Sequence, residues 1–114
     1  MDPVSALLIN KALDGLSMRA LATAQNIANV NSPNFRPVRV SFEDALRSAV
    51  QGGPERLAAL KPRLEQAPRS AASSEMRLDL ELATASETGL RYAALIDLLG
   101  RQMQISRTVI RGGQ

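Results

Sequence analysis

Hydrophobic and small residues recur every three or four positions near both ends of the chain. This spacing predicts two long amphipathic helices, over residues 3–30 and 79–111. The alternation of three and four is the a/d pattern of a coiled coil. Further apolar positions widen both stripes beyond what one partner helix covers. The predicted seams consist, in order, of Ala6, Ile9, Leu13, Leu16, Ala20, Thr23, Ile27 and Val30, and of Leu82, Ala85, Gly89, Tyr92, Ile96, Leu99, Met103, Ser106 and Ile110.

The sequence between the two helices is short and irregular. Residues 38–42 alternate apolar and polar side chains, which suggests a short extended piece. Ser41 resembles an N-cap for a short helix that begins with two acidic residues and ends at Gly52-Gly53. Beyond it, prolines and a Ser/Ala run lack a lasting period, although residues 54–60 could form a helical turn. We expect most of this stretch to be a linker.

These elements predict one all-α domain with four parts. They are an N-terminal coiled-coil helix in residues 1–33, a turn with a short extended and helical segment in 34–53, a flexible linker in 54–78, and a C-terminal coiled-coil helix in 79–114. We expect the two long helices to pack as an antiparallel coiled-coil hairpin. Their surplus apolar surface predicts a subunit of a helical assembly.

Composition argues against most enzymatic functions. The 114 residues include no cysteine and no histidine, which excludes thiolate and imidazole chemistry and the commonest ligands of transition metals. The nearest carboxylate pairs, Glu43/Asp44 and Asp79/Glu81, lie where helices are predicted to begin, and they fit helix N-terminal charges better than an acid/base pair. Tyr92 falls on the predicted seam, a position that fits packing better than catalysis. We therefore expect no enzyme activity, no catalytic residue, no metal site and no cofactor.

One segment, at the end of the first predicted helix, contains residues that a simple helix end does not require. Residues 26–36 read NIANVNSPNFR, with two asparagines inside the predicted helix, where asparagine is a poor helix former. Their amides could bond to neighbouring chains or to the returning backbone. Ser32-Pro33 stops the helix, and Asn34 tolerates a left-handed backbone better than most residues.

This segment resembles the flagellar rod, hook and hook-associated family, whose N-terminal helix ends in a pattern like N-x-A-N-x-x-T/S-P-G-Y/F-K/R. The resemblance covers roughly residues 10–47 and 76–110, and it is greatest for the short proximal-rod members. Asn34 stands where the family usually has glycine. The residues of the motif, which we expect to fix the turn and contact neighbouring subunits, are Asn26, Ala28, Asn29, Ser32, Pro33, Asn34, Phe35 and Arg36.

The resemblance implies a structural subunit of the bacterial flagellar basal body. It implies export through the flagellar type III apparatus without a cleaved signal peptide, assembly of a periplasmic rod through the terminal helices, and transmission of motor torque. The implied partners are other copies of the chain, rod proteins such as FlgC, FlgF and FlgG-like subunits, the rod-base adaptor FliE, the MS-ring protein FliF and an FlhB-like export gate. Neither nucleic acid nor a small-molecule substrate is implied. We expect the seam within the subunit to include Leu13, Leu16, Ile27, Leu82, Tyr92, Ile96, Leu99 and Met103.

Two other functions stay open at this point. A small helical-hairpin adaptor or export chaperone would bind a partner helix between its own helices and would not polymerise. A nucleic-acid binder would show steeply salt-dependent binding. The net charge of only +3 and the scattered arginines argue against the second of these.

Overall fold

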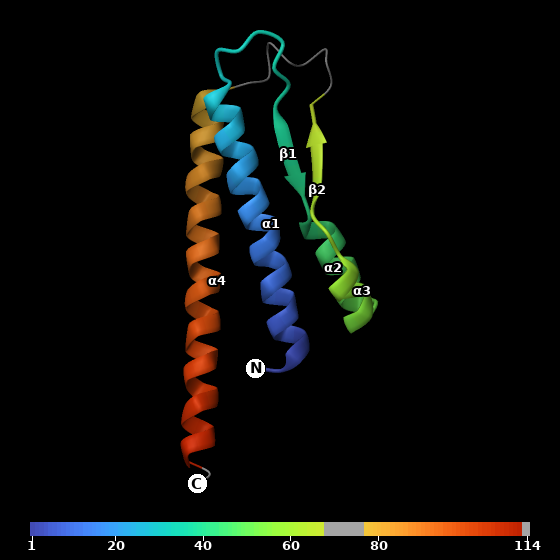
Figure 1. Ribbon diagram of the computed structural model, residues 1–114, viewed down its shortest axis with the longest axis vertical. Coiled ribbons are helices and arrows are strands. Elements are labelled where there is room, and N and C mark those ends of the chain that lie inside the picture. The colour runs from blue at the N-terminus through green and yellow to red at the C-terminus, as the bar shows by residue number, and fades with distance from the viewer. Residues whose placement is uncertain (68–76, 113–114) are drawn as a thin grey trace.

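The computed structural model describes residues 1–67 and 77–112, which form an elongated body with principal-axis extents of 64 × 28 × 13 Å. A long N-terminal helix, a small two-stranded sheet with two short helices, and a long C-terminal helix follow one another along the chain (Figure 1). The elements are α1 (Pro3–Ala28), β1 (Val38–Ser41), α2 (Glu43–Gln51), α3 (Pro54–Ala59), β2 (Arg63–Gln66) and α4 (Leu78–Gly112).

Helix α1 begins where the sequence predicts. The Asp2 carboxylate accepts hydrogen bonds from the Ser5 amide at 2.8 Å and from the Ser5 hydroxyl at 2.9 Å. These two bonds hold the pKa of Asp2 below its usual value, because they favour the ionised carboxylate. Pro3 occupies the first turn, where its missing N–H removes no helical bond. The helix ends two residues before the predicted Val30, with Asn29 as its C-cap.

The turn after α1 confirms the prediction for Asn34. This residue has a φ of 64°, and among the described residues other than glycine it is the one with a positive φ. Its short polar side chain makes this left-handed backbone less costly than it is for most residues.

The sheet and α3 correct the predictions of an all-α fold and of a flexible linker over 54–78. Residues 54–59 form α3 and residues 63–66 form β2, which pairs antiparallel with β1 in the register Val38↔Gln66 to Ser41↔Arg63. The helical turn expected for residues 54–60 is thus confirmed by α3, whereas the linker prediction is wrong where β2 forms. Residues 68–76 lie outside the described part. Ser41 is also not an N-cap. It ends β1, and α2 begins after Phe42 without a side-chain cap.

The core lies between α1 and β1. Its buried members are Leu16, Ala22, Val38, Val40 and Phe42. A Cβ atom added at Gly15 would lie 2.5 Å from atoms of the Phe42 ring, so the glycine lets the ring rest directly on the α1 backbone. The small size of this core leaves much apolar surface elsewhere on the chain.

Helix α4 runs beside α1 in the opposite direction and continues past the start of α1 (Figure 1). The predicted coiled-coil hairpin is nevertheless not confirmed, because α4 presents a different face to α1. Its buried residues are Glu81 and Thr88, one position before the predicted seam residues Leu82 and Gly89. No helix in the described ranges combines the length and the apolar character needed to cross a membrane.

Candidate functional site

The motif-bearing end of α1 forms a buried polar junction with β1 and α4. Asn26 has no exposed surface, and its Nδ2 donates to the Val38 carbonyl at 2.9 Å and to Glu81 Oε2 at 3.1 Å. Its Oδ1 accepts from the Val38 amide at 2.8 Å. The other carboxylate oxygen of Glu81 lies 2.8 Å from Arg39 Nη2. We call these four residues, Asn26, Val38, Arg39 and Glu81, the polar junction.

The polar junction explains why asparagine stands inside the helix. Val38 and Val40 turn their backbone groups away from β2, because alternate residues of a strand point their N–H and C=O groups to opposite sides. The side-chain amide of Asn26 pairs with both backbone groups of Val38: its Nδ2 donates to the carbonyl, and its Oδ1 accepts from the N–H. The prediction that the motif amides could bond to the returning backbone is thus confirmed for Asn26.

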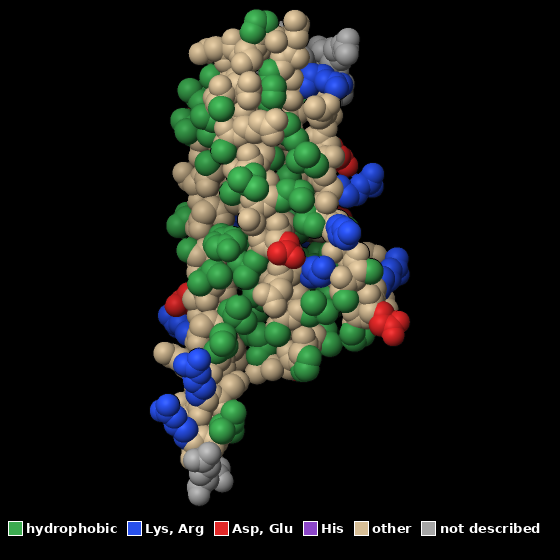
Figure 2. Space-filling model, viewed as in Figure 1, with side chains coloured by type: hydrophobic (Ala, Val, Ile, Leu, Met, Phe, Trp, Pro, Cys, Tyr) green, Lys and Arg blue, Asp and Glu red, His purple; other side chains and the backbone are tan. Residues whose placement is uncertain are grey.

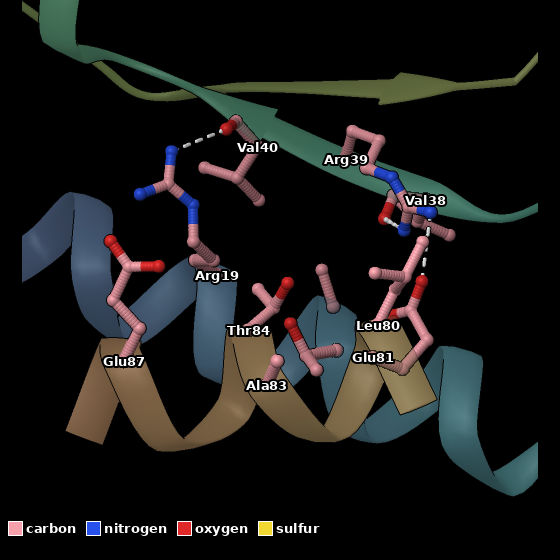
Figure 3. Close-up of a pocket in the computed structure, with 11 residues that line it drawn as sticks. Arg19, Val38, Arg39, Val40, Leu80, Glu81, Ala83, Thr84 and Glu87 are labelled. Carbon is pink, nitrogen blue, oxygen red and sulfur yellow. Dashed lines mark hydrogen bonds and ion pairs between the residues drawn. The ribbon is translucent and has the colours of Figure 1, made fainter. Parts of the chain in front are cut away.

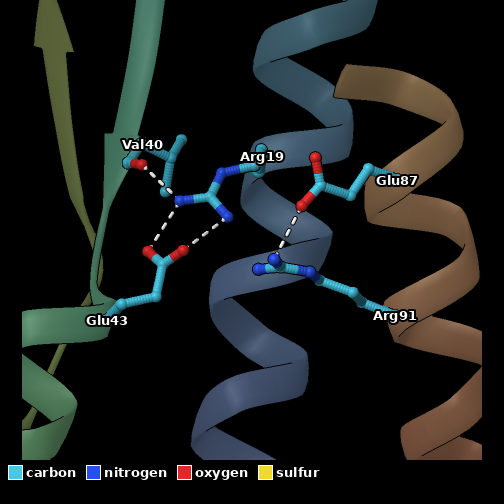
Figure 4. A network of polar contacts seen from close by, with 5 residues as sticks. All are labelled: Arg19, Val40, Glu43, Glu87 and Arg91. Carbon is cyan, nitrogen blue, oxygen red and sulfur yellow. Dashed lines mark hydrogen bonds and ion pairs between the residues drawn. The ribbon is translucent and has the colours of Figure 1, made fainter. Parts of the chain in front are cut away.

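A second polar contact ties α1 to the start of α2. The Arg19 guanidinium donates to both carboxylate oxygens of Glu43, at 2.8 and 2.7 Å, and Nη2 also donates to the Val40 carbonyl at 2.8 Å (Figure 4). Its carbon Cζ lies 4.9 Å from the centre of the Phe42 ring. These hydrogen bonds hold the pKa of Glu43 below its usual 4.5. Arg19 and Asn26 therefore stand along one side of α1 and fix β1 to it.

A groove of about 480 Å³ lies between β1 and the first turns of α4. Its walls carry charged groups of both signs, including Arg19, Arg39 and Glu87, next to Val40 and Leu80 (Figure 3). Glu87 forms an ion pair with Arg91 one helical turn further on, at 2.6 Å. Among the described residues, no group of three or more carboxylates could hold a metal ion. The groove thus combines charged and apolar walls.

The other motif residues shape the turn. Asn29 Nδ2 donates to the Gln25 carbonyl at 2.9 Å, and its Oδ1 accepts from the Ser32 hydroxyl at 3.0 Å. Phe35 packs against the core, and Arg36 Nη2 donates to the Gln66 side chain at 2.6 Å. Ala28, Ser32, Pro33 and Asn34 are exposed. Their predicted contacts with neighbouring subunits stay a prediction.

The predicted seam is only partly inside the single chain. Leu13 and Leu16 are buried, and Ile27 and Leu99 are half-buried. The α4 residues Leu82, Tyr92, Ile96 and Met103 are between 39% and 52% exposed, so they do not close a seam within the subunit. The physical reason is that α4 docks through the face centred on Glu81 and Thr88. This face keeps Leu99 half-buried but leaves Leu82, Ile96 and Met103 largely exposed to solvent.

Exposed apolar side chains flank the docked face of α4 on both sides. At 100° per residue, one flank lies on the side of the predicted seam and the other on the opposite side. Apolar side chains are spread along both long helices, and basic side chains gather at the end of α4 (Figure 2). The first flank contains Leu82, Ile96 and Met103, and the second contains Leu80, Leu98, Ile105 and Val109.

The chain combines two long helices, a motif-bearing turn and apolar side chains exposed on both flanks of α4, and exposed apolar patches of this kind mark sites of protein–protein contact. Comparison with known proteins gives a more specific likeness. The chain is similar to the flagellar basal body rod protein FlgB of Borrelia hermsii, with 45% identity over 47 residues, or 41% of this chain and 35% of the relative. FlgB of Borreliella burgdorferi is 42% identical over 40 residues, or 35% of this chain and 30% of the relative.

The resemblance to FlgB is thereby confirmed, and the matches span about a third of the length of each curated relative. FlgB is also the member that the sequence favours over the other short rod protein, FlgC, on the strength of Leu90-Arg91-Tyr92 and of the acidic start at Asp79 and Glu81. No protein-family model matches the chain.

Sequence patterns alone missed the partners of the motif. Glu81 fits the pattern of a helix N-terminal charge, yet it is 3% exposed and belongs to the polar junction. Arg19 fits the pattern of a solvated surface charge, and its role needs Glu43 and Val40 from another element. Glycine inside a helix is not a reliable signal of such contacts either, because Gly15 lies against Phe42 whereas a Cβ at Gly89 or Gly100 would meet nothing within 4 Å.

Proposed function

We propose that this chain is a structural subunit of the bacterial flagellar basal-body rod, in the proximal part of that rod. The observation that carries the proposal is the similarity to FlgB in two curated relatives, whose names describe basal body rod proteins. The two apolar flanks of α4 support it independently, because a subunit inside a tube needs more than one contact surface on each helix.

In this proposal the subunits polymerise through their terminal helices. Helix α4 already uses one face against α1, so its two flanks are available to neighbouring copies. Burying the exposed apolar side chains on both flanks would stabilise an assembly by about 25 cal/mol for each Å² removed from water. The resulting rigid helical packing would pass torque from the motor along the rod.

The proposal includes export by the flagellar type III apparatus without a cleaved signal peptide, and a final position in the periplasmic rod. The family resemblance supports this route. The expected neighbours are further copies and the rod proteins FlgC, FlgF and FlgG-like subunits, together with FliE, FliF and an FlhB-like gate at the base. A small folding core also fits a chain that must be unfolded for export and gains stability on assembly.

The test is complementation of a strain that lacks this chain. Ile96→Asp places a charge on the first apolar flank, where the side chain is 45% exposed and is free to meet a neighbour. Gln104→Asp adds the same charge to an exposed polar position of α4 and serves as the matched control. We expect no swimming and no complete rods with the Ile96 variant, and normal swimming with the control, at equal cellular amounts of protein.

Normal swimming of the Ile96→Asp strain would contradict assembly through this flank. A purified chain that forms a discrete dimer and binds one partner helix, without entering basal bodies, would favour the adaptor or chaperone hypothesis instead.

A further inference from the structure

The apolar pattern of α4 does not by itself select the face that docks on α1. Exposed leucines, isoleucines and valines lie on both flanks of the helix, and its a/d pattern predicts a seam one position later than the observed one. If apolar burial alone decided, α4 would turn Leu82 and Ile96 toward α1. The structure instead turns Glu81 and Thr88 inward, with the half-buried Leu95 and Leu99 further along the same face.

A specific polar match holds the observed face in place. The buried carboxylate of Glu81 accepts from Asn26 through Oε2 and from Arg39 through Oε1, so both of its oxygens have partners on two different elements. Rotation of α4 by one residue would put Leu80 or Leu82 against the Asn26 amide. A slide of one heptad would bring Thr88 there, and its side chain is too short to reach Arg39 as well.

We propose that Glu81 is the residue that sets the rotational register of α4 on α1, and that it thereby decides which apolar flanks the subunit presents to its partners. A buried polar group is suited to this task, because a misaligned arrangement leaves it without partners whereas apolar side chains tolerate several alignments. The register itself concerns the folded single chain, and only its consequence for partners rests on the proposed function.

Thiol labelling tests the register directly, because the chain has no cysteine of its own. Thr88→Cys places a thiol at a position that is 3% exposed on the docked face, and Leu90→Cys places one at a position that is 73% exposed. Leu57→Cys reports on the α1–α3 body, where Leu57 is fully buried. The measurement is the rate of reaction of each single thiol with a maleimide.

With Glu81 in place, we expect position 88 to react at least about 10-fold more slowly than position 90. Glu81→Leu should bring the rate at position 88 close to that at position 90, while position 57 stays protected. Glu81→Gln should keep most of the protection, because its amide oxygen can still accept from Asn26. The matched control is Glu87→Leu, which removes an exposed glutamate of the same helix and should change none of the rates.

Two results would overturn the proposal. Position 88 could stay protected in the Glu81→Leu variant, which would mean that apolar packing sets the register. Positions 57 and 88 could lose protection together, which would mean that Glu81 supports the whole fold and does not choose a face. Equal labelling of positions 88 and 90 with Glu81 present would contradict the docked arrangement from which the proposal starts.

Discussion

Replacement of Asn26 by alanine should destabilise the chain far more than the same replacement of Asn29, although both asparagines belong to one motif. Asn26 is fully buried, and its loss leaves the Val38 amide without a partner and removes a donor from the Glu81 carboxylate. The Val38 carbonyl keeps a second donor, Arg39 Nη1, at 3.2 Å. The hydrogen bonds of Asn29 lie at the surface, where water can replace them.

The magnitude follows from these contacts. An unsatisfied buried amide costs about 1–3 kcal/mol, and a lost hydrogen bond to a charged group costs roughly 1.5–3 kcal/mol. Alanine regains up to about 0.7 kcal/mol of helix propensity. We therefore expect Asn26→Ala to lower the free energy of unfolding by about 3 kcal/mol, and Asn29→Ala by less than about 1 kcal/mol.

The assay is urea unfolding followed by far-UV circular dichroism, with both variants and the parent chain measured in the same buffer. Linear extrapolation gives the free energy of unfolding of each chain. Equal losses for Asn26→Ala and Asn29→Ala, or a loss below about 1 kcal/mol for both, would refute the assignment of the polar junction as a buried hydrogen-bonded site.

Three further predictions concern other parts of the chain. Gly15→Ala should lower the free energy of unfolding by about 1–2 kcal/mol in the same urea assay. The added Cβ would meet the Phe42 ring at 2.5 Å, and this overpacking exceeds the gain in helix propensity. An unchanged or raised free energy of unfolding would contradict the close approach of Phe42 to Gly15. The pKa of Glu43 is lowered in the folded chain, so its contribution is present above about pH 4.5 and is lost as the pH falls through the lowered value. Acid titration of stability should therefore be shallower below pH 4.5 in Glu43→Gln than in the parent, and identical slopes would argue against the pair with Arg19. Leu99→Asp should abolish both rod assembly and motility, because Leu99 is half-buried on the docked face. Normal swimming of that variant would contradict the packing of this face of α4 against α1.

Much of the fold follows from local patterns. Asp2-Pro3 and the asparagine-rich turn set the ends of α1, and the alternation in residues 38–42 indicates β1. The strand β2 could not be predicted in the same way, because Arg63–Gln66 is exposed along its whole length and gains its structure from pairing with β1, far away in the sequence. Pairing of this kind depends on tertiary context more than on local propensity.

The docked face of α4 was missed for a different reason. A heptad pattern identifies apolar stripes, but α4 carries apolar residues on both flanks, and the face that docks on α1 includes the buried Glu81, which accepts a hydrogen bond from Asn26. A buried glutamate has no signature in a single sequence, because the same residue two positions after Asp79 also fits a charged helix start. The motif indicated that Asn26 mattered, yet only the fold identified Val38, Arg39 and Glu81 as its partners.

The most direct test of the proposed rod function is to locate the chain in purified flagellar basal bodies. An epitope-tagged chain that supports swimming would be detected by immunogold electron microscopy after the basal bodies are isolated. We expect label on the rod close to the inner-membrane ring, and none when the tagged chain carries Ile96→Asp. Absence of the functional tagged chain from basal bodies, with all of it recovered in one-to-one complexes with another protein, would rule out a rod subunit.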